Sequence, residues 1–317
     1  HVGKVFLATK SLTMHSPEEM RKNNPSNDVT VNDAKRPFVT DVVTSVGMER
    51  FMFDVPFQLE NKVEVYMQVV QDAMTSSLTS LLKNSAARYA KLKVNALRTD
   101  GRIDWLMERY DTKGKENHPM KGRPAEPAQC AIYTAAMNYV NEVEKALDSD
   151  DGWKAVEKYS KIQNQDLLDL VLLTRTKVTA EDRSRIMVLI TMDAHSRDTI
   201  TDLVRQQVEN KGQFQWSRQL RQSYDAVSKA FVIRNFDANF KYAYEYLGNG
   251  GRLVITPLTD RIYCTCCQAY TLKLGCAPAG PAGTGKTETT KDLAFALAVC
   301  IYVFNCSPEM DYISMGN

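Results

Sequence analysis

The chain has 317 residues, of which 44% are hydrophobic and 25% are charged, so its composition is that of a folded protein rather than a disordered one. Forty basic and 38 acidic residues leave a formal net charge of +2, which gives no general attraction to nucleic acid or to an anionic membrane. The longest apolar run, residues 293–304, is too short to span a bilayer. We therefore predict neither a nucleic-acid partner nor a membrane.

The cysteine count indicates a cellular compartment, and the first residue indicates whether the sequence is part of a longer protein. Seven cysteines are too few for a disulfide scaffold of this length, and they suit a reducing cytosol. The sequence opens on His1, with neither an initiator methionine nor a signal peptide, so we expect a piece of a longer protein. The length is sufficient for two domains.

The first part of the chain changes from short β-like runs to a helical pattern. Residues 2–8 and 38–46 resemble strands on either side of a polar turn. From Glu60 onward, apolar residues recur at steps of three and four, which predicts a long helix with one apolar face. That face comprises Val63, Tyr66, Val70, Met74, Leu78 and Leu81.

Residues 97–127 break this pattern with glycines, prolines and many charges, so we predict an inserted surface loop. Two further apolar stripes follow, within residues 132–147 and 167–172. Thr179 and Asp182 then stand three apart before an apolar stretch, which is typical of a capped helix start. Up to about residue 210 the chain is predicted to form several packed helices.

The hydrophobic period then becomes two. Residues 236–246 alternate strictly, which predicts a strand with its aromatic side chains on one face. Few basic residues flank it, so a packed sheet face or a seam between domains is favoured over a base-stacking surface. Phe214 and Trp216 begin a shorter alternation of the same kind. We place the domain boundary near residues 225–250, with residues 1–225 mostly helical and residues 226–317 forming a second unit.

One motif carries chemistry. Residues 280–287 read Gly-Pro-Ala-Gly-Thr-Gly-Lys-Thr and match the phosphate-binding P-loop pattern in full. Glycines let successive N–H groups point inward at phosphate oxygens, Lys286 brings a positive charge to the β- and γ-phosphates, and the Thr287 hydroxyl can bind Mg²⁺. The following residues favour a helix whose N-terminus faces the phosphates. Residues 299–304 are then predicted to form a buried parallel strand.

The predicted nucleotide site is only half present. A P-loop fold needs further strands, and acidic residues at a later strand end that hold Mg²⁺ and order water. No apolar strand ending in Asp-Glu follows Thr287 within these residues. We therefore expect this chain alone to bind nucleotide without hydrolysing it.

Several segments resemble the dynein heavy chains, of the axonemal type. They are Tyr-Glu-Tyr-Leu-Gly-Asn at residues 244–249, Arg-Leu-Val-Ile-Thr-Pro-Leu-Thr-Asp-Arg at 252–261, the loop with its helix at 280–293, and Val-Phe-Asn-Cys-Ser at 303–307. A looser resemblance runs through residues 192–198 and 214–220. It implies a mainly α linker domain, built of helix bundles with a few strands, over residues 1–225. The truncated start of an α/β P-loop (AAA+) domain would follow over residues 226–317.

The resemblance implies an ATP-driven microtubule motor, in which turnover at the first AAA+ module moves the linker. Microtubules would be bound by other parts of the parent chain, and the partners would be further dynein heavy, intermediate and light chains. The location implied is the cytoplasmic cytoskeleton, in the axoneme of a cilium or flagellum. The later acidic motif, the arginine finger and the remaining ring modules do not occur in these residues.

The resemblance also assigns roles to residues. Lys286 and Thr287 would be catalytic, with Thr287 also the Mg²⁺ ligand. An apolar strip stiffened by proline would line the adenine pocket, which agrees with its composition. The residues that would hold ATP or ADP are Leu253, Val254, Ile255, Pro257, Leu258, Pro281, Ala282, Gly283, Thr284, Gly285, Lys286, Thr287 and Glu288.

Other interpretations remain open. The chain could belong to a different P-loop ATPase with an N-terminal helical regulatory domain, or be an interaction segment that does not hydrolyse nucleotide. Cys264 and Cys267 have metal-ligand spacing, but a second pair is lacking, so buried thiols are favoured over a zinc site. His195 lies between Asp193 and Asp198, where we favour structural hydrogen bonds near a helix start over catalysis.

Overall fold

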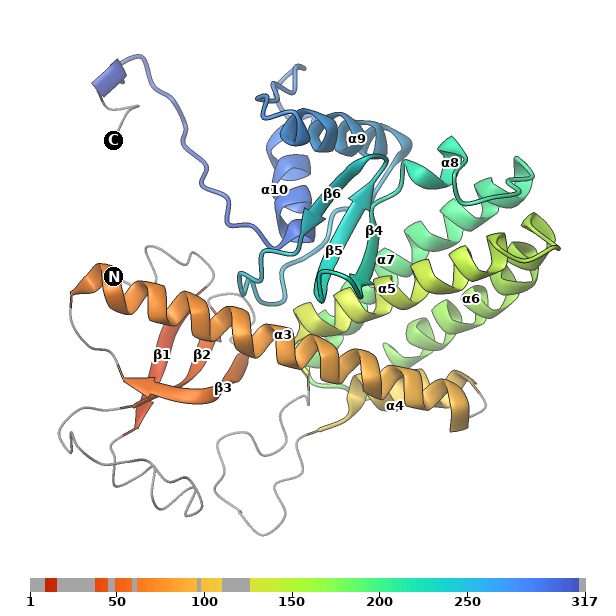
Figure 1. Ribbon diagram of the computed structural model, residues 1–317, viewed down its shortest axis with the longest axis horizontal. Coiled ribbons are helices and arrows are strands. Elements are labelled where there is room, and N and C mark those ends of the chain that lie inside the picture. Colours follow the sequence, from red (N-terminus) through yellow and green to blue (C-terminus); the bar gives the residue numbers. More distant parts are fainter. Residues whose placement is uncertain are drawn as a thin grey trace, which may run out of the picture.

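The structure is a computed structural model that describes residues 9–15, 38–44, 49–58, 62–95, 98–109 and 126–313 (Figure 1). Helices predominate in these ranges and are accompanied by two small antiparallel sheets. The strands are β1 (Thr9–His15), β2 (Phe38–Thr44), β3 (Arg50–Gln58), β4 (Arg221–Asp225), β5 (Ala230–Asn235) and β6 (Ala238–Lys241). The helices are α3 (Val63–Asn95), α4 (Arg98–Met107), α5 (Ala128–Leu147), α6 (Trp153–Leu173), α7 (Ala180–Arg205), α8 (Phe214–Ser217), α9 (Pro257–Thr271) and α10 (Lys286–Leu297).

The N-terminal sheet runs in the order β1-β2-β3 and is covered by α3 (Figure 1). The middle of the apolar stripe predicted for this helix is buried, because Val70, Met74 and Leu78 are at most 1% exposed and pack with Phe51 of β3, whereas Val63 at its start is 47% exposed. The prediction of a long amphipathic helix from Glu60 is thus confirmed. The predicted β run at residues 2–8 lies outside the described residues, whereas the run that starts at residue 38 is confirmed by β2.

The prediction that residues 97–127 form a loop is wrong for residues 98–107, which form α4. Trp105 and Leu106 are nearly inaccessible and pack against α5 and α7. Arg102 makes two hydrogen bonds to Asp193, at 2.8 and 3.1 Å. Burial of these side chains outweighs the low helix propensity of the segment. Residues 110–125 lie outside the described part of the chain.

Helices α5, α6 and α7 form the packed bundle that the sequence predicts. Val140, Val156 and Ile200 share one core among these helices, and Trp216 closes its end. Thr179 caps α7, because its hydroxyl accepts a hydrogen bond from the Asp182 N–H at 3.2 Å. The predicted capped start is therefore confirmed.

The second sheet runs in the order β4-β5-β6 and packs against α5 on one side and α9 on the other (Figure 1). A single strand over residues 236–246 is wrong, because Phe236 at φ +50° makes the turn between β5 and β6, and β6 ends at Lys241. Phe214 and Trp216 are also not in a strand, since they form the short helix α8. The aromatic residues of this segment are still more buried than the residues between them. This alternation comes from packing and does not require a continuous strand.

The aromatic residues after β6 join distant parts of the molecule. Tyr246 is completely buried and its ring lies 4.4 Å from that of Phe51, with the ring planes at 68°. Its hydroxyl donates to Glu49 at 2.7 Å. Tyr242 packs edge-on against Tyr133 of α5. The expectation that these aromatic side chains are packed is therefore confirmed for Tyr242 and Tyr246.

The C-terminal helices α9 and α10 pack together beside β6, around Ala238, Tyr263 and Leu293. The buried strand predicted at residues 299–304 is wrong. These residues extend away from α10 without strand structure (Figure 1), and Tyr302 and Phe304 are 50% and 75% exposed. A strand needs a neighbouring ladder, and the described part of the chain places none beside them.

Among the helices in the described ranges, none combines the length and apolar character needed to cross a bilayer.

Candidate nucleotide-binding site

The predicted phosphate loop is curled and leads directly into α10. The Lys286 ammonium group folds back over it and donates hydrogen bonds to the carbonyl oxygens of Gly280 at 2.5 Å and Pro281 at 2.6 Å. The Thr284 hydroxyl donates to the same Pro281 oxygen at 2.9 Å. These bonds hold the two ends of the loop together at the start of α10, and the loop is exposed to solvent.

The curl depends on two glycines in the left-handed region. Gly283 has a φ of +80° and Gly285 a φ of +77°, and Gly285 is also the N-cap of α10. A side chain at either position would meet backbone strain, because the left-handed region is unfavourable for residues with a Cβ. A hypothetical Cβ at these positions meets no atom within 4 Å, so the requirement for glycine comes from backbone conformation rather than from crowding.

The electrostatics of the loop favour an anion. The first N–H groups of a helix have no acceptor within the helix, and the N-terminal end of the helix dipole is positive. Lys286 adds a positive charge at this end, and Thr287 is exposed in the first turn of the helix. Glu288 points into solvent and forms an ion pair with Lys291 at 2.8 Å. Pro281, Ala282 and Thr284 are likewise exposed.

The residues predicted to line an adenine pocket divide between two faces. Leu253 and Ile255 are half-buried, with Ile255 packed against the α9–α10 core. Val254 is 70% exposed, Pro257 is exposed, and Leu258 is 64% exposed in the first turn of α9. The strip is extended, so alternate residues point inward and outward. Val254, Pro257 and Leu258 are therefore the members available to a ligand.

One residue of this region was missed by the sequence analysis. Asp292 of α10 is 6% exposed and receives hydrogen bonds from Arg252, from the Leu253 N–H and from the Tyr263 hydroxyl. Its partners lie 29 to 40 positions away in the chain. No local pattern could have identified it, although a lone acidic residue on the inner face of a predicted helix is a signal of a buried partner.

The far end of α10 is held by the chain that returns from β6. The N–H groups of Ala243 and Glu245 donate to the carbonyl oxygens of Leu297 and Ala298, both at 3.2 Å. These two carbonyls lie at the C-terminus of the helix, where acceptors inside the helix are used up. The predicted phosphate loop thus adjoins the first turn of α10. The last turn of α10 adjoins the segment of Tyr242 and Tyr246, which we call the aromatic seam.

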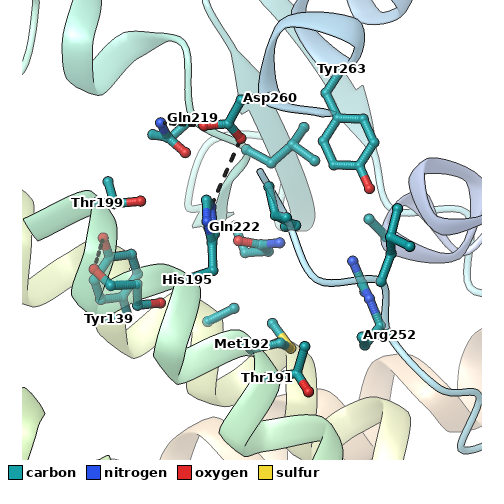
Figure 2. A pocket seen from close by; sticks show the side chains of 16 residues that line it. Tyr139, Thr191, Met192, His195, Thr199, Gln219, Gln222, Arg252, Asp260 and Tyr263 are labelled. Carbon is teal, nitrogen blue, oxygen red and sulfur yellow. Dashed lines mark hydrogen bonds and ion pairs between the residues drawn. The ribbon is translucent and has the colours of Figure 1, made fainter. Parts of the chain in front are cut away.

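His195 lies in the middle of α7 and not at its start. It faces the first turn of a different helix, where its Nε2 is 3.9 Å from Asp260 (Figure 2). Gln219 donates to the same carboxylate at 3.1 Å. Burial lowers the pKa of His195 below 6.5, against the opposing effect of Asp260.

Two small cavities adjoin this contact. Their volumes are about 60 and 160 Å³, and both are lined by His195, Gln219 and Asp260. Figure 2 shows the first, which Arg252 and Tyr263 border from the side of α9 and α10. Ligand pockets have volumes of about 300–1,000 Å³, so these cavities are interstices of a packed seam.

The cysteines on α9 make separate, ordinary contacts. The Cys264 thiol donates to the carbonyl of Arg218 at 3.2 Å, and Cys267 is buried in the α9–α10 core. Within the described residues, no group of three or more histidine, cysteine or acidic side chains could hold a metal ion.

The chain is similar to known proteins, and the similarity includes the loop. Residues 242–317 match the family model described as the hydrolytic ATP-binding site of the dynein motor region. The whole chain aligns at 40% identity over 321 residues with the dynein alpha chain of the flagellar outer arm from Chlamydomonas reinhardtii, covering 6% of that protein.

Two further relatives agree. A ciliary dynein beta chain from Tripneustes gratilla is 41% identical over 267 residues, which are 84% of this chain and 5% of the relative. The human dynein axonemal heavy chain 17 is 38% identical over 271 residues, 85% of this chain and 6% of the relative. The chain thus spans about one twentieth of the length of the relatives it matches.

Proposed function

This chain belongs to the dynein heavy-chain family, of the axonemal type, and we propose that it is the part of such a motor in which a nucleotide-binding module joins a mechanical linker. The observation that carries the proposal is the curled loop at the start of α10. Its position at a helix N-terminus, its lysine and its left-handed glycines suit a triphosphate and Mg²⁺.

We assign roles within the loop as follows. Residues 281–288 hold the phosphates of ATP or ADP through backbone N–H groups, with Lys286 turning from the loop carbonyls to the β- and γ-phosphates. The Thr287 hydroxyl is the Mg²⁺ ligand, and the bound ion would neutralise charge on the phosphates. Lys286 and Thr287 are accordingly the residues of this chain that take part in catalysis.

The base is placed on the outer face of the strip. Val254, Pro257 and Leu258 present an exposed apolar surface at the start of α9. An apolar strip with a stiff backbone fits a flat aromatic base. Leu253 and Ile255 are half-buried behind this surface, and Ile255 packs against the α9–α10 core.

Residues 1–225 are assigned to the linker and residues 226–317 to its junction with the first AAA+ module. The boundary falls in the turn between β4 and β5. We propose that nucleotide state moves the linker through α10, because the residues that follow β6 are hydrogen-bonded to its last turn. The aromatic seam then connects that point to α5 and the N-terminal sheet.

ATP turnover and microtubule movement are assigned to the complete heavy chain. Within these 317 residues no apolar strand ending in Asp-Glu follows the loop, so we expect binding without turnover from this part alone. The relatives are flagellar, ciliary and axonemal proteins, which supports a location of the parent protein in the axoneme. Its proposed partners there are other dynein chains.

The test is equilibrium binding of fluorescent MgATP to the chain and to its Lys286→Ala variant. A hydrogen bond to a charged group is worth about 1.5–3 kcal/mol, so we expect affinity to fall about 10- to 100-fold. The lysine makes its contacts only within the exposed loop, so thermal unfolding should be unaltered.

Lys211→Ala is the matched control, because this lysine is 51% exposed and pairs only with Asp148 in the helical bundle. It should leave binding unchanged. If the unaltered chain binds no MgATP, the nucleotide site is refuted and the alternative of an interaction segment gains. If binding is equal in both variants, the role of Lys286 is refuted.

A further inference from the structure

A buried carboxylate connects the phosphate-binding helix to the strip proposed to receive the base. Asp292 lies six residues after Lys286 on α10, a distance of about 9 Å along the helix axis. The Arg252 Nε lies 2.8 Å from one of its oxygens, and the Arg252 Nη2 donates to the other at 2.9 Å. The side chains of both residues are at most 7% exposed.

Two further donors complete the coordination of this carboxylate. The Leu253 backbone N–H donates to Oδ1 at 3.1 Å, and the Tyr263 hydroxyl donates to Oδ2 at 2.6 Å. Tyr263 is 2% exposed. Burial, and then the charge of Asp292, raise the pKa of Tyr263 well above its usual value, so this hydroxyl stays protonated and remains a donor.

The three partners flank the base strip. Arg252 and Leu253 are its beginning, and Tyr263 lies on α9, the helix whose first turn carries Pro257 and Leu258. A single carboxylate on α10 therefore ties both ends of the strip to the helix that follows the phosphate loop. Buried charges cost several kcal/mol unless they are paired, so a buried pair with this many hydrogen bonds holds one geometry.

The guanidinium group is also fixed from its other side. Arg252 lies over the ring of Phe295, 5.3 Å from its centroid, one turn further along α10. The ring itself is packed against the backbone before the strip, since a Cβ on Gly250 would lie 3.0 Å from it. The register between strip and helix is thus set by ionic, hydrogen-bonding and steric contacts together.

We propose that Asp292 is a positioning residue that sets recognition of the base, by holding the strip at a fixed distance from the phosphate loop. This rests on the proposed nucleotide site. According to this proposal, the phosphates and the base bind to separate parts of one site, and Asp292 affects only the part that binds the base. A loss of about 1.4 kcal/mol in the contact with the base lowers affinity tenfold, so the effect is measurable.

The test compares two probes, MgATP and magnesium tripolyphosphate, which has the phosphates but no base. The ratio of their dissociation constants reports what the base contributes. Asp292→Asn keeps the shape of the side chain but puts an amide where Arg252 needs a carboxylate. We expect MgATP affinity to fall about tenfold with tripolyphosphate affinity unchanged. Tyr263→Phe, which removes one hydrogen bond, should move the ratio in the same direction by less.

Asp193→Asn is the control for a merely structural effect. Asp193 is also buried and makes a two-bonded pair with Arg102, but it lies on α7 in the helical bundle. It should lower the unfolding temperature and leave the ratio unchanged. An unaltered ratio in Asp292→Asn overturns the inference, as does an equal change in Asp193→Asn. If Asp292→Asn does not fold, an unaltered ratio in Tyr263→Phe overturns it.

Failure of the proposed function has a different signature. In that case the unaltered chain binds neither probe, and the inference falls with it. If the unaltered chain binds both probes and only the ratio fails to respond to Asp292→Asn, the nucleotide site stands and the role of Asp292 alone is refuted.

Discussion

Gly285 shows how much of the loop is decided by single residues. It is both the N-cap of α10 and one of the two left-handed glycines of the loop. The sequence motif identified it because the spacing of glycines in a phosphate loop reflects backbone conformation, which is local. Such positions can be predicted from sequence, since the physical requirement lies within a few residues.

We predict that Gly285→Ala lowers the free energy of unfolding by about 1–2 kcal/mol, because an L-residue is strained at this φ. Chemical denaturation measures it, and MgATP binding should weaken as the loop opens. Gly251→Ala is the control, since a Cβ there meets no atom within 4 Å and its φ is outside the left-handed region. An equal loss of unfolding free energy in Gly285→Ala and Gly251→Ala would contradict the requirement for a left-handed glycine at position 285.

Asp292 illustrates what sequence could not predict at this scale. Its importance comes from Arg252 and Tyr263, which fall in other segments and reach it only after folding. The base strip shows the same limit. Its composition indicated an apolar surface, but only packing against α9 and α10 determines that Leu253 turns inward and Val254 outward.

At the scale of elements, the long helices were predictable and the strands less so, while α4 was expected to be a loop and the short α8 a strand. A helix makes its hydrogen bonds within itself, so a period of 3.6 in α3 or a cap at Thr179 is sufficient evidence. A strand needs a partner supplied by a distant segment. Residues 299–304 have the composition of a strand without a neighbouring ladder in the described chain. Of residues 236–246, only 238–241 form a strand, after the turn at Phe236.

The cap of α7 gives a prediction at this scale. Thr179→Ala should cost about 1 kcal/mol of stability, because the Asp182 N–H loses its acceptor. Thr201→Ala on the same helix is the comparison, since its hydroxyl only bonds back to the Arg197 carbonyl. That change should be close to neutral. The denaturant midpoints of the two variants measure these losses of stability. A larger loss for Thr201→Ala than for Thr179→Ala would refute the role of the cap.

For the whole molecule, the contact between α7 and α9 makes stability depend on pH. Burial holds the pKa of His195 below 6.5 in the folded chain. As pH falls through 6.5, the unfolded chain binds this proton first, so stability is lost on acidification, by at most about 1.4 kcal/mol per pH unit. Asp260 and Asp198 oppose this shift and Arg252 adds to it.

We therefore predict that His195→Gln removes this loss between pH 7.5 and about 5.5. The measurement is the difference in unfolding free energy between the variant and the unaltered chain at each pH. The difference is needed because burial raises the pKa of Glu49 and Glu126, and such carboxyl groups give a dependence of opposite sign. A difference that does not change with pH would refute the role of His195.

The attachment of α10 at both of its ends has a mechanical consequence. A helix of 12 residues is about 18 Å long and stiff along its axis, because every turn is hydrogen-bonded to the next. Its first turn follows the loop and its last turn is bonded to Ala243 and Glu245. A tilt of the helix therefore moves both of its ends. Because Asp292 is held near the middle of the helix, the two ends would move in opposite directions.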